Sequence, residues 1–257
     1  MSFRVDVDLT NPGQFFGCCG LFELASRLDV DATAYFDRGG FSVSGRPELS
    51  AVLGQLTAAG LEQLDPSDGT ASPILIPSPL RLRLDWWKDE RSGGRDLKVW
   101  AGSMQSVRIA QAMLGALRDP MLHTPALFDV GQIVYDPAEP TKKVEPFYFD
   151  ARRASNAHSL DIGFSPNDLE LTTIAFPAVE VLCLVGLQRF RPSETGEPRI
   201  FEYCTWSNSL PVSVAALVAA GAVPLRGTRR YRFENWFRSG QRKHKAFRAA
   251  VSVAEGK

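Results

Sequence analysis

Several residue types that carry chemistry are scarce in this chain of 257 residues. It holds four cysteines and three histidines, and no two cysteines form a CxxC pair. A zinc site or a disulfide framework is therefore not expected. The chain also lacks HExxH, GxSxG and GxxxxGK[ST] motifs and any cluster of carboxylates at metal-ligand spacing. These absences predict a protein that is not an enzyme and that holds neither a metal nor a cofactor.

Long apolar runs are missing as well. No uninterrupted apolar stretch approaches the roughly 20 residues that cross a bilayer. The first ten residues, MSFRVDVDLT, alternate apolar and charged side chains and do not form the apolar block of a signal peptide. We therefore expect a cytoplasmic protein that does not enter a membrane. With 44% hydrophobic residues, the chain is long and apolar enough to bury a large core.

Charge is balanced in total but uneven along the chain. There are 29 basic and 29 acidic residues, which gives a net charge of zero. The stretch from Arg226 to Arg248, RGTRRYRFENWFRSGQRKHKAFR, holds nine basic residues and one acid. Nine minus one leaves +8 for this stretch, so the rest of the chain carries −8. The C-terminal region is predicted to be a basic patch on an acidic body.

The order of the patterns in the first 87 residues predicts a ferredoxin-like unit. Period-2 alternation and helical spacing indicate a strand at 3–9, a helix to residue 28, a hairpin at 32–45, a helix at 47–64 and a strand at 80–87. This is the βαββαβ order. We expect an α+β fold with the ferredoxin-like unit in residues 1–136, which also include a charged loop inserted at 88–102.

The second half, residues 147–257, is expected to mix helices with antiparallel strands and to end in the basic hairpin. The proline-containing segment 137–146 is the candidate boundary, although the two halves can share one core. Segment 176–190 predicts a central helix, and the apolar segment PVSVAALVAAG, which ends at Gly221, predicts a buried one.

The segment NPGQFFGCCGLFELASRL, residues 11–28, has three possible interpretations: a phosphate cradle, a reactive thiol site or a closely packed helix. Gly13, Gly17 and Gly20 fall on one helical face, no basic residue follows closely, and no base lies nearby to activate Cys18 or Cys19. Close packing of another backbone against the glycine face is therefore favoured.

The basic hairpin is the main candidate for a nucleic-acid site. On a strand, Tyr231 and Phe233 share one face and Arg230 and Arg232 the other, so one face can pack while the other presents charge. Phosphates require Lys or Arg at several points. The expected contacts are Arg229, Arg230, Arg232, Arg238, Arg242, Lys243 and Lys245. The alternative is an edge strand whose charges prevent aggregation.

Two weaker sets of candidates lie elsewhere. Lys88, Arg91 and Arg95 follow Trp86 and Trp87 and could form a basic and aromatic finger, or else a balanced solvated loop. Arg152 and Arg153 could contact phosphate, or else mark a simple turn after a strand. His244 is the one candidate for a metal-independent ribonuclease, but it has no evident partner acid or base.

Four segments resemble, in order, segments of the Csb-three family of type I-G (formerly I-U) CRISPR systems. They are NPGQFFGCCGLFELASRL, LKVWAGSMQSVRIAQAMLGAL, PFYFDARRASNAHSLDIGFSPN and FPAVEVLCLVGLQRFRP. The resemblance implies a non-catalytic subunit of a Cascade interference complex, with other Cascade subunits and CRISPR RNA or target DNA as partners. It also implies the large-subunit position, where the flanking motif is read and the displaced strand is held. Two other interpretations stay open: a ribonuclease that processes CRISPR RNA and a purely structural subunit that docks another protein.

Overall fold

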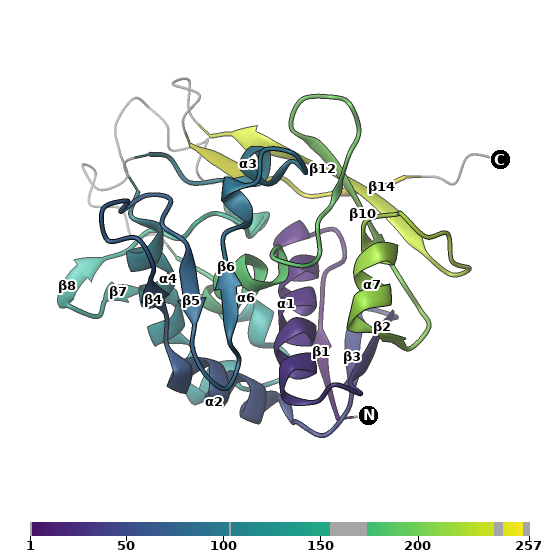
Figure 1. Ribbon diagram of the computed structural model, residues 1–257, viewed down its shortest axis with the longest axis horizontal. Helices are drawn as coiled ribbons and strands as arrows, with labels where there is room; N and C mark the ends of the chain where they lie inside the picture. The colour runs from purple at the N-terminus through teal and green to yellow at the C-terminus, as the bar shows by residue number, and fades with distance from the viewer. Residues whose placement is uncertain (1, 103, 155–173, 239–243, 254–257) are drawn as a thin grey trace.

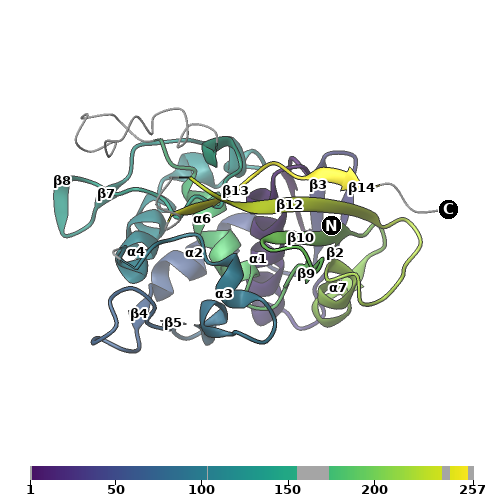
Figure 2. The same ribbon diagram turned by 90° about the horizontal axis from the view of Figure 1, so that it is seen from above.

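The computed structural model describes residues 2–102, 104–154, 174–238 and 244–253. They form an α+β protein in which helices pack between and beside antiparallel sheets (Figures 1 and 2). The α-helices are α1 (Pro12–Leu28), α2 (Leu49–Ala59), α3 (Gly94–Leu97), α4 (Ser106–Ala116), α6 (Pro177–Gly186) and α7 (Val212–Ala219). Short 3-10 turns are η1 (Trp86–Lys88), η2 (Pro120–Leu122) and η3 (Leu127–Asp129).

The strands of the first half are β1 (Phe3–Asp6), β2 (Thr33–Asp37), β3 (Gly40–Ser44), β4 (Glu62–Gln63), β5 (Ile74–Ile76), β6 (Leu82–Leu84), β7 (Tyr135–Asp136) and β8 (Glu139–Lys143). Those of the second half are β9 (Ser193–Glu194), β10 (Ile200–Thr205), β11 (Leu210–Pro211), β12 (Arg229–Phe237), β13 (Lys245–Phe247) and β14 (Val251–Val253). The α+β class expected from the sequence is confirmed.

The first sheet has the strand order β1-β3-β2-β11, and all its pairs are antiparallel. Its first three strands, together with α1, are compatible with the expected ferredoxin-like order. The strand expected to complete that unit, β6, pairs with β5 in a separate sheet of order β4-β5-β6. Only five residues separate β5 from β6, so the two strands form a local antiparallel hairpin.

The second large sheet has the order β13-β12-β10-β9, with β14 also paired to β12. Figure 2 looks down on it and shows β12 between β10 on one side and β13 and β14 on the other. The expected basic hairpin is thus present, because β12 and β13 are antiparallel partners.

Helix α1 lies between the two large sheets and joins them. Asn11 caps it, since its side-chain oxygen accepts hydrogen bonds from the backbone N–H groups of Gly13 and Gln14, and Pro12 occupies the first turn. Phe15 stacks on Phe36 of the first sheet, with ring centroids 5.2 Å apart, and on Tyr203 of the second, at 4.2 Å. The core is therefore built around this one helix.

Helices α1 and α6 approach each other through glycine. A Cβ atom on Gly20 would overlap the carbonyl group of Leu182, and one on Gly186 would overlap the carbonyl oxygen of Phe16. The close backbone packing expected from the glycine face of residues 11–28 is confirmed. The described core also includes side chains from both expected halves of the chain.

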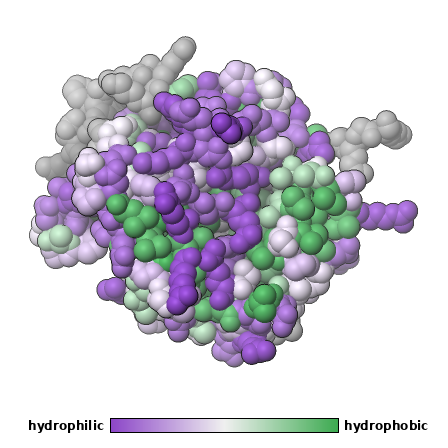
Figure 3. Space-filling model, viewed as in Figure 1, coloured by the Kyte–Doolittle hydropathy of each residue, from purple (hydrophilic) through white to green (hydrophobic). Residues whose placement is uncertain are grey.

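The candidate boundary segment 137–146 contains β8, which is exposed along its length and pairs with β7. The expectation of a buried helix ending at Gly221 is wrong in part, because α7 is buried on one side only and its Val214 and Leu217 are exposed. Figure 3 shows the apolar surface of this region at the right of the view. Within the described residues, no helix is long and apolar enough to cross a membrane.

Candidate nucleic-acid interface

Strand β12 has one buried and one exposed face, as its alternating sequence predicts. Tyr231 and Phe233 are buried in the core, where Phe233 contacts Phe247 of β13 at a ring-centroid distance of 5.0 Å. Arg230 and Arg232 lie on the opposite face and keep about half of their side-chain surface exposed, at 51% and 43%. The aromatic residues hold the strand in place while the arginines face solvent.

The alternative explanation, a charged edge strand, does not fit this topology. β10 pairs with residues 229–234 on one side of β12. On the other side, β14 pairs with residues 230–232 and β13 with residues 235–237. Because β12 has partners on both sides, its charges cannot serve to protect an unpaired edge.

Glu202 of β10 organises the two exposed arginines. Its carboxylate accepts two hydrogen bonds from Arg232, from Nε at 2.8 Å and Nη2 at 2.7 Å, and lies 3.4 Å from Arg230. The carboxylate itself is 11% exposed. One shared anion beneath two cations leaves a net charge of +1 at the surface and fixes both side chains in position.

A second group of charges continues this arrangement along β12. Glu234 lies 3.3 Å from Arg248 and 3.8 Å from Arg199, and the Arg248 guanidinium also lies 5.0 Å from the centre of the Trp236 ring. This group also carries a net charge of +1. We refer to Arg199, Arg230, Arg232 and Arg248, with Glu202 and Glu234, as the arginine face.

Two expected contact residues, Arg238 and Lys245, are less exposed than the sequence predicts. Arg238 is buried, with its guanidinium 3.5 Å from the centre of the Tyr148 ring and its Nε donating to the Lys245 carbonyl. Lys245 is half-buried and donates from Nζ to the Asp96 carbonyl at 2.9 Å. Burial lowers the pKa of Lys245 to about 8. Arg238 therefore packs and does not reach solvent, while Lys245 is only partly available.

The other candidate contacts lie in the hairpin and in the segment that begins at η1. Arg242 and Lys243 lie outside the described residues. Lys88 is 3.7 Å from Asp68, and Arg95 forms an ion pair with Glu90. Arg91 is exposed. Two of these three cations are thus paired with acids, which favours the balanced-loop alternative for Lys88 and Arg95.

Trp86 and Trp87 do not form a surface finger, which corrects the aromatic part of that hypothesis. Both side chains are buried. The Trp86 indole donates to the Leu184 carbonyl at 3.0 Å and that of Trp87 to the Ala71 carbonyl at 2.9 Å. Their large apolar area and satisfied N–H groups explain why they belong to the core.

Arg152 stabilises the local structure. It binds the buried Asp150 carboxylate at 2.7 Å and Asp129 at 2.8 Å, and its guanidinium lies 3.6 Å from the centre of the Phe176 ring. The next residue, Arg153, has a buried Nε without a hydrogen-bond partner in the described part of the chain. The turn interpretation thus accounts for Arg152.

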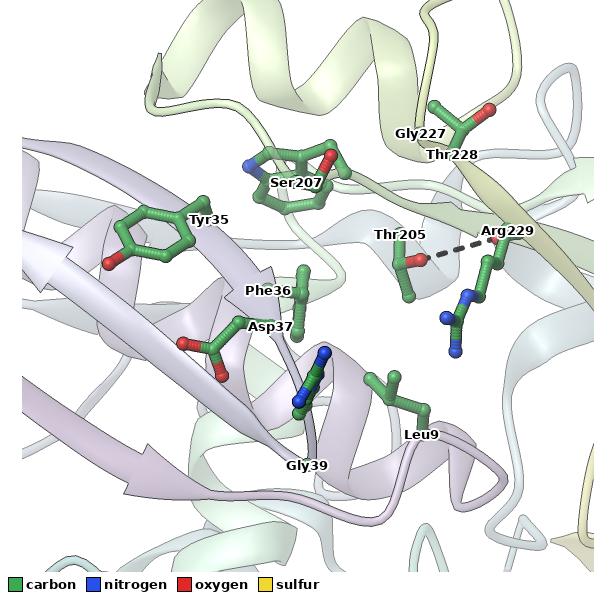
Figure 4. Close-up of a pocket in the computed structure, with 12 residues that line it drawn as sticks. Leu9, Tyr35, Phe36, Asp37, Gly39, Thr205, Ser207, Gly227, Thr228 and Arg229 are labelled. Atoms are coloured by element: carbon green, nitrogen blue, oxygen red, sulfur yellow. Dashed lines mark hydrogen bonds between the residues drawn. The ribbon is translucent and has the colours of Figure 1, made fainter.

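Arg229, at the start of β12, faces a separate pocket. This pocket has a volume of about 430 Å³ and lies between the turn that joins β2 to β3 and the end of β10. Figure 4 shows Arg229 extending from β12 toward Leu9, with Thr205 beside it. Arg38, Trp206 and Ser207 are among the other residues of its wall.

Three cations of these surfaces were not selected from the sequence. Arg248 belongs to the basic stretch but follows a turn whose length the pattern does not define. Arg199 lies in the turn before β10 and adopts a positive φ of 64°, and Arg38 lies in the β2–β3 turn. Membership of the basic stretch was a signal for Arg248, whereas only the tertiary structure brings Arg199 to the arginine face and Arg38 to the pocket.

No group of His, Cys, Asp and Glu side chains within the described residues could hold a metal ion. All four cysteines are buried thiols, and burial raises the pKa of Cys18 and Cys19 well above the ordinary value, which opposes thiolate formation.

Comparisons of the chain with protein-family models, with curated proteins and with solved structures found no match.

Proposed function

We propose that this protein is a non-catalytic, cytoplasmic subunit that binds nucleic acid in a type I CRISPR RNA-guided DNA surveillance (Cascade) complex. In this proposal it occupies the large-subunit position, where it contacts the flanking motif, target DNA or CRISPR RNA beside the other Cascade subunits. Base pairing reads most of the target in such systems, and protein contacts the flanking motif and the backbone. The four resembling segments named above motivate the choice of complex.

The observation that carries the binding function is the arginine face, with Arg230 and Arg232 on the interior strand β12 and Arg199 and Arg248 beside it. Four guanidinium groups stand over two carboxylates that are more buried than they are. Guanidinium groups form paired hydrogen bonds with phosphate oxygens, and several exposed guanidinium groups on one surface are what a nucleic-acid backbone requires. Because edge protection does not explain Arg230 and Arg232, binding of a polyanion is the function that these charges support best.

The test is binding of a labelled single-stranded RNA and of a flanking-motif duplex to the purified chain across a salt series. The Arg230→Gln/Arg232→Gln variant is compared with wild type. Arg83→Gln serves as the matched control, because Arg83 is also an exposed strand arginine paired with a carboxylate, Asp85, at 2.8 Å. Each lost phosphate contact reduces the salt slope for a single strand by about 0.7, so the double variant is expected to reduce it by about 1.4.

Unchanged affinity and slope in the double variant would refute the binding role of this face. If the variant instead fails to join the co-expressed complex while it keeps its nucleic-acid affinity, the face is a protein-docking surface. Cleavage of RNA that His244→Ala abolishes would contradict the non-catalytic assignment.

A further inference from the structure

The pocket beside β12 is formed where the two large sheets meet. After β10, the chain crosses to the first sheet, where the Trp206 indole donates to the Ala34 carbonyl at 2.8 Å and the Phe36 N–H donates to the Trp206 carbonyl. Two turns complete the wall, one at Gly39 and one at Gly227, with φ values of 76° and 83°. A side chain at Gly227 would overlap the Ser207 hydroxyl, so glycine allows the turn at Gly227 to approach Ser207.

The pocket carries a net positive charge. Its wall holds two arginines, Arg38 and Arg229, and one acid, Asp37. Asp37 is already neutralised, because it accepts a hydrogen bond from Arg4 at 2.6 Å. In the described part of the chain, neither wall arginine has an ion-pair partner. Two uncompensated guanidinium groups at one concave site favour an anion with several oxygens.

The rest of the wall combines polar groups with aromatic side chains that are mostly buried. Phe36 and Trp206 lie beneath the wall in the core, at 3% and 0% exposed, and Tyr35 is half-buried at its edge. Thr205, Ser207 and Thr228 supply hydroxyl groups that can donate or accept hydrogen bonds. A volume of about 430 Å³ falls in the range of small-ligand sites and exceeds what a bare phosphate fills.

We propose that this pocket binds one nucleoside phosphate unit, with Arg38 and Arg229 on the phosphate and the hydroxyl groups of the wall beside the sugar and the polar edge of the base. The unit is either a free nucleotide or a single nucleotide of a bound strand. In the second case the inference rests on the proposed function, because β12 supplies Arg229 as well as Arg230 and Arg232 of the arginine face.

The experiment measures binding of the four nucleoside 5′-monophosphates and of inorganic phosphate to the full chain by calorimetry. Wild type is expected to bind at least one monophosphate saturably and more tightly than phosphate. Arg38→Gln is expected to weaken that binding at least tenfold, and Arg83→Gln to leave it unchanged. Arg38 is exposed in a turn, so its replacement should not impair folding.

The same variants are titrated with the labelled single strand to identify the source of the ligand. Weaker strand binding by Arg38→Gln indicates a nucleotide of the strand, and unchanged strand binding indicates a free nucleotide. Absence of saturable monophosphate binding, equal affinity for phosphate, or no effect of Arg38→Gln would overturn the proposal. Arg230→Gln/Arg232→Gln tests the proposed function separately, because those residues do not line the pocket.

Discussion

Replacing Gly20 by alanine is the sharpest test of the packing that holds this protein together. In an isolated helix the change would stabilise, because alanine is favoured over glycine by about 1 kcal/mol. Here the new Cβ atom would overlap the Leu182 carbonyl of α6 and approach the Gly186 nitrogen. Both are main-chain atoms, so the overlap can be relieved only by moving one helix away from the other.

Overpacking of this kind costs about 1–3 kcal/mol, and more where backbone must shift. The separation of α1 from α6 also loosens the aromatic contacts that α1 makes with both sheets. We therefore expect Gly20→Ala to lower the free energy of unfolding by about 3 kcal/mol. For a chain of this size that corresponds to a fall in Tm of roughly 6–12 °C.

Gly54→Ala provides the matched control in a helix of the same protein. No atom lies within 4 Å of a Cβ built on Gly54, and its backbone is helical. This variant should gain up to about 1 kcal/mol through helix propensity alone. Both variants are measured by urea unfolding followed by circular dichroism. A Gly20→Ala protein as stable as Gly54→Ala would refute the close approach of α1 and α6.

Three further predictions concern single side chains. Burial raises the pKa of Glu180 from 4.5 to about 8, so the folded state keeps a proton that the unfolded chain releases. Wild type should therefore lose stability as the pH rises from 4.5 to 8, whereas Glu180→Gln should lack this loss; parallel pH profiles in thermal unfolding would contradict the assignment. Asn11→Ala should destabilise by about 2 kcal/mol in urea unfolding, because Asn11 caps α1 and also bonds Asp150 and Ala151, and a loss below 0.5 kcal/mol would count against that role. Glu202→Gln should strengthen RNA binding at low salt, because it removes the anion shared by Arg230 and Arg232; weaker binding would show that the carboxylate is needed to position them.

Local features of the sequence account for much of the first half. Asn11 and Pro12 mark the start of α1, and the alternation in residues 33–44 predicts the β2–β3 hairpin. Such signals depend on the residues themselves and their near neighbours. The partner of β6 was missed for a different reason: β5 has only three residues, too few for an alternating pattern to indicate a strand.

In the candidate site, too, some features follow from the local sequence and others depend on residues that are distant in the chain. The two faces of β12 follow from period-2 alternation, and the structure confirms them. The alternation does not predict how buried each arginine is or what it binds. Arg238 is buried against the Tyr148 ring, and Arg152 forms ion pairs with Asp150 and Asp129. In the sequence these arginines look the same as Arg230, since the Tyr148 ring that covers Arg238 and the Asp129 carboxylate that binds Arg152 are distant in the chain.

The sequence by itself determined the α+β class, the close glycine packing of α1 and the alternating faces of β12, because each depends on spacing along one element. Only the tertiary structure decided that β12 is an interior strand, that Glu202 joins two arginines and that Arg38 shares a pocket with Arg229. These features require residues from different elements to meet in space. The physical reason is that periodicity specifies which face of an element is buried, whereas long-range packing specifies what that face contacts.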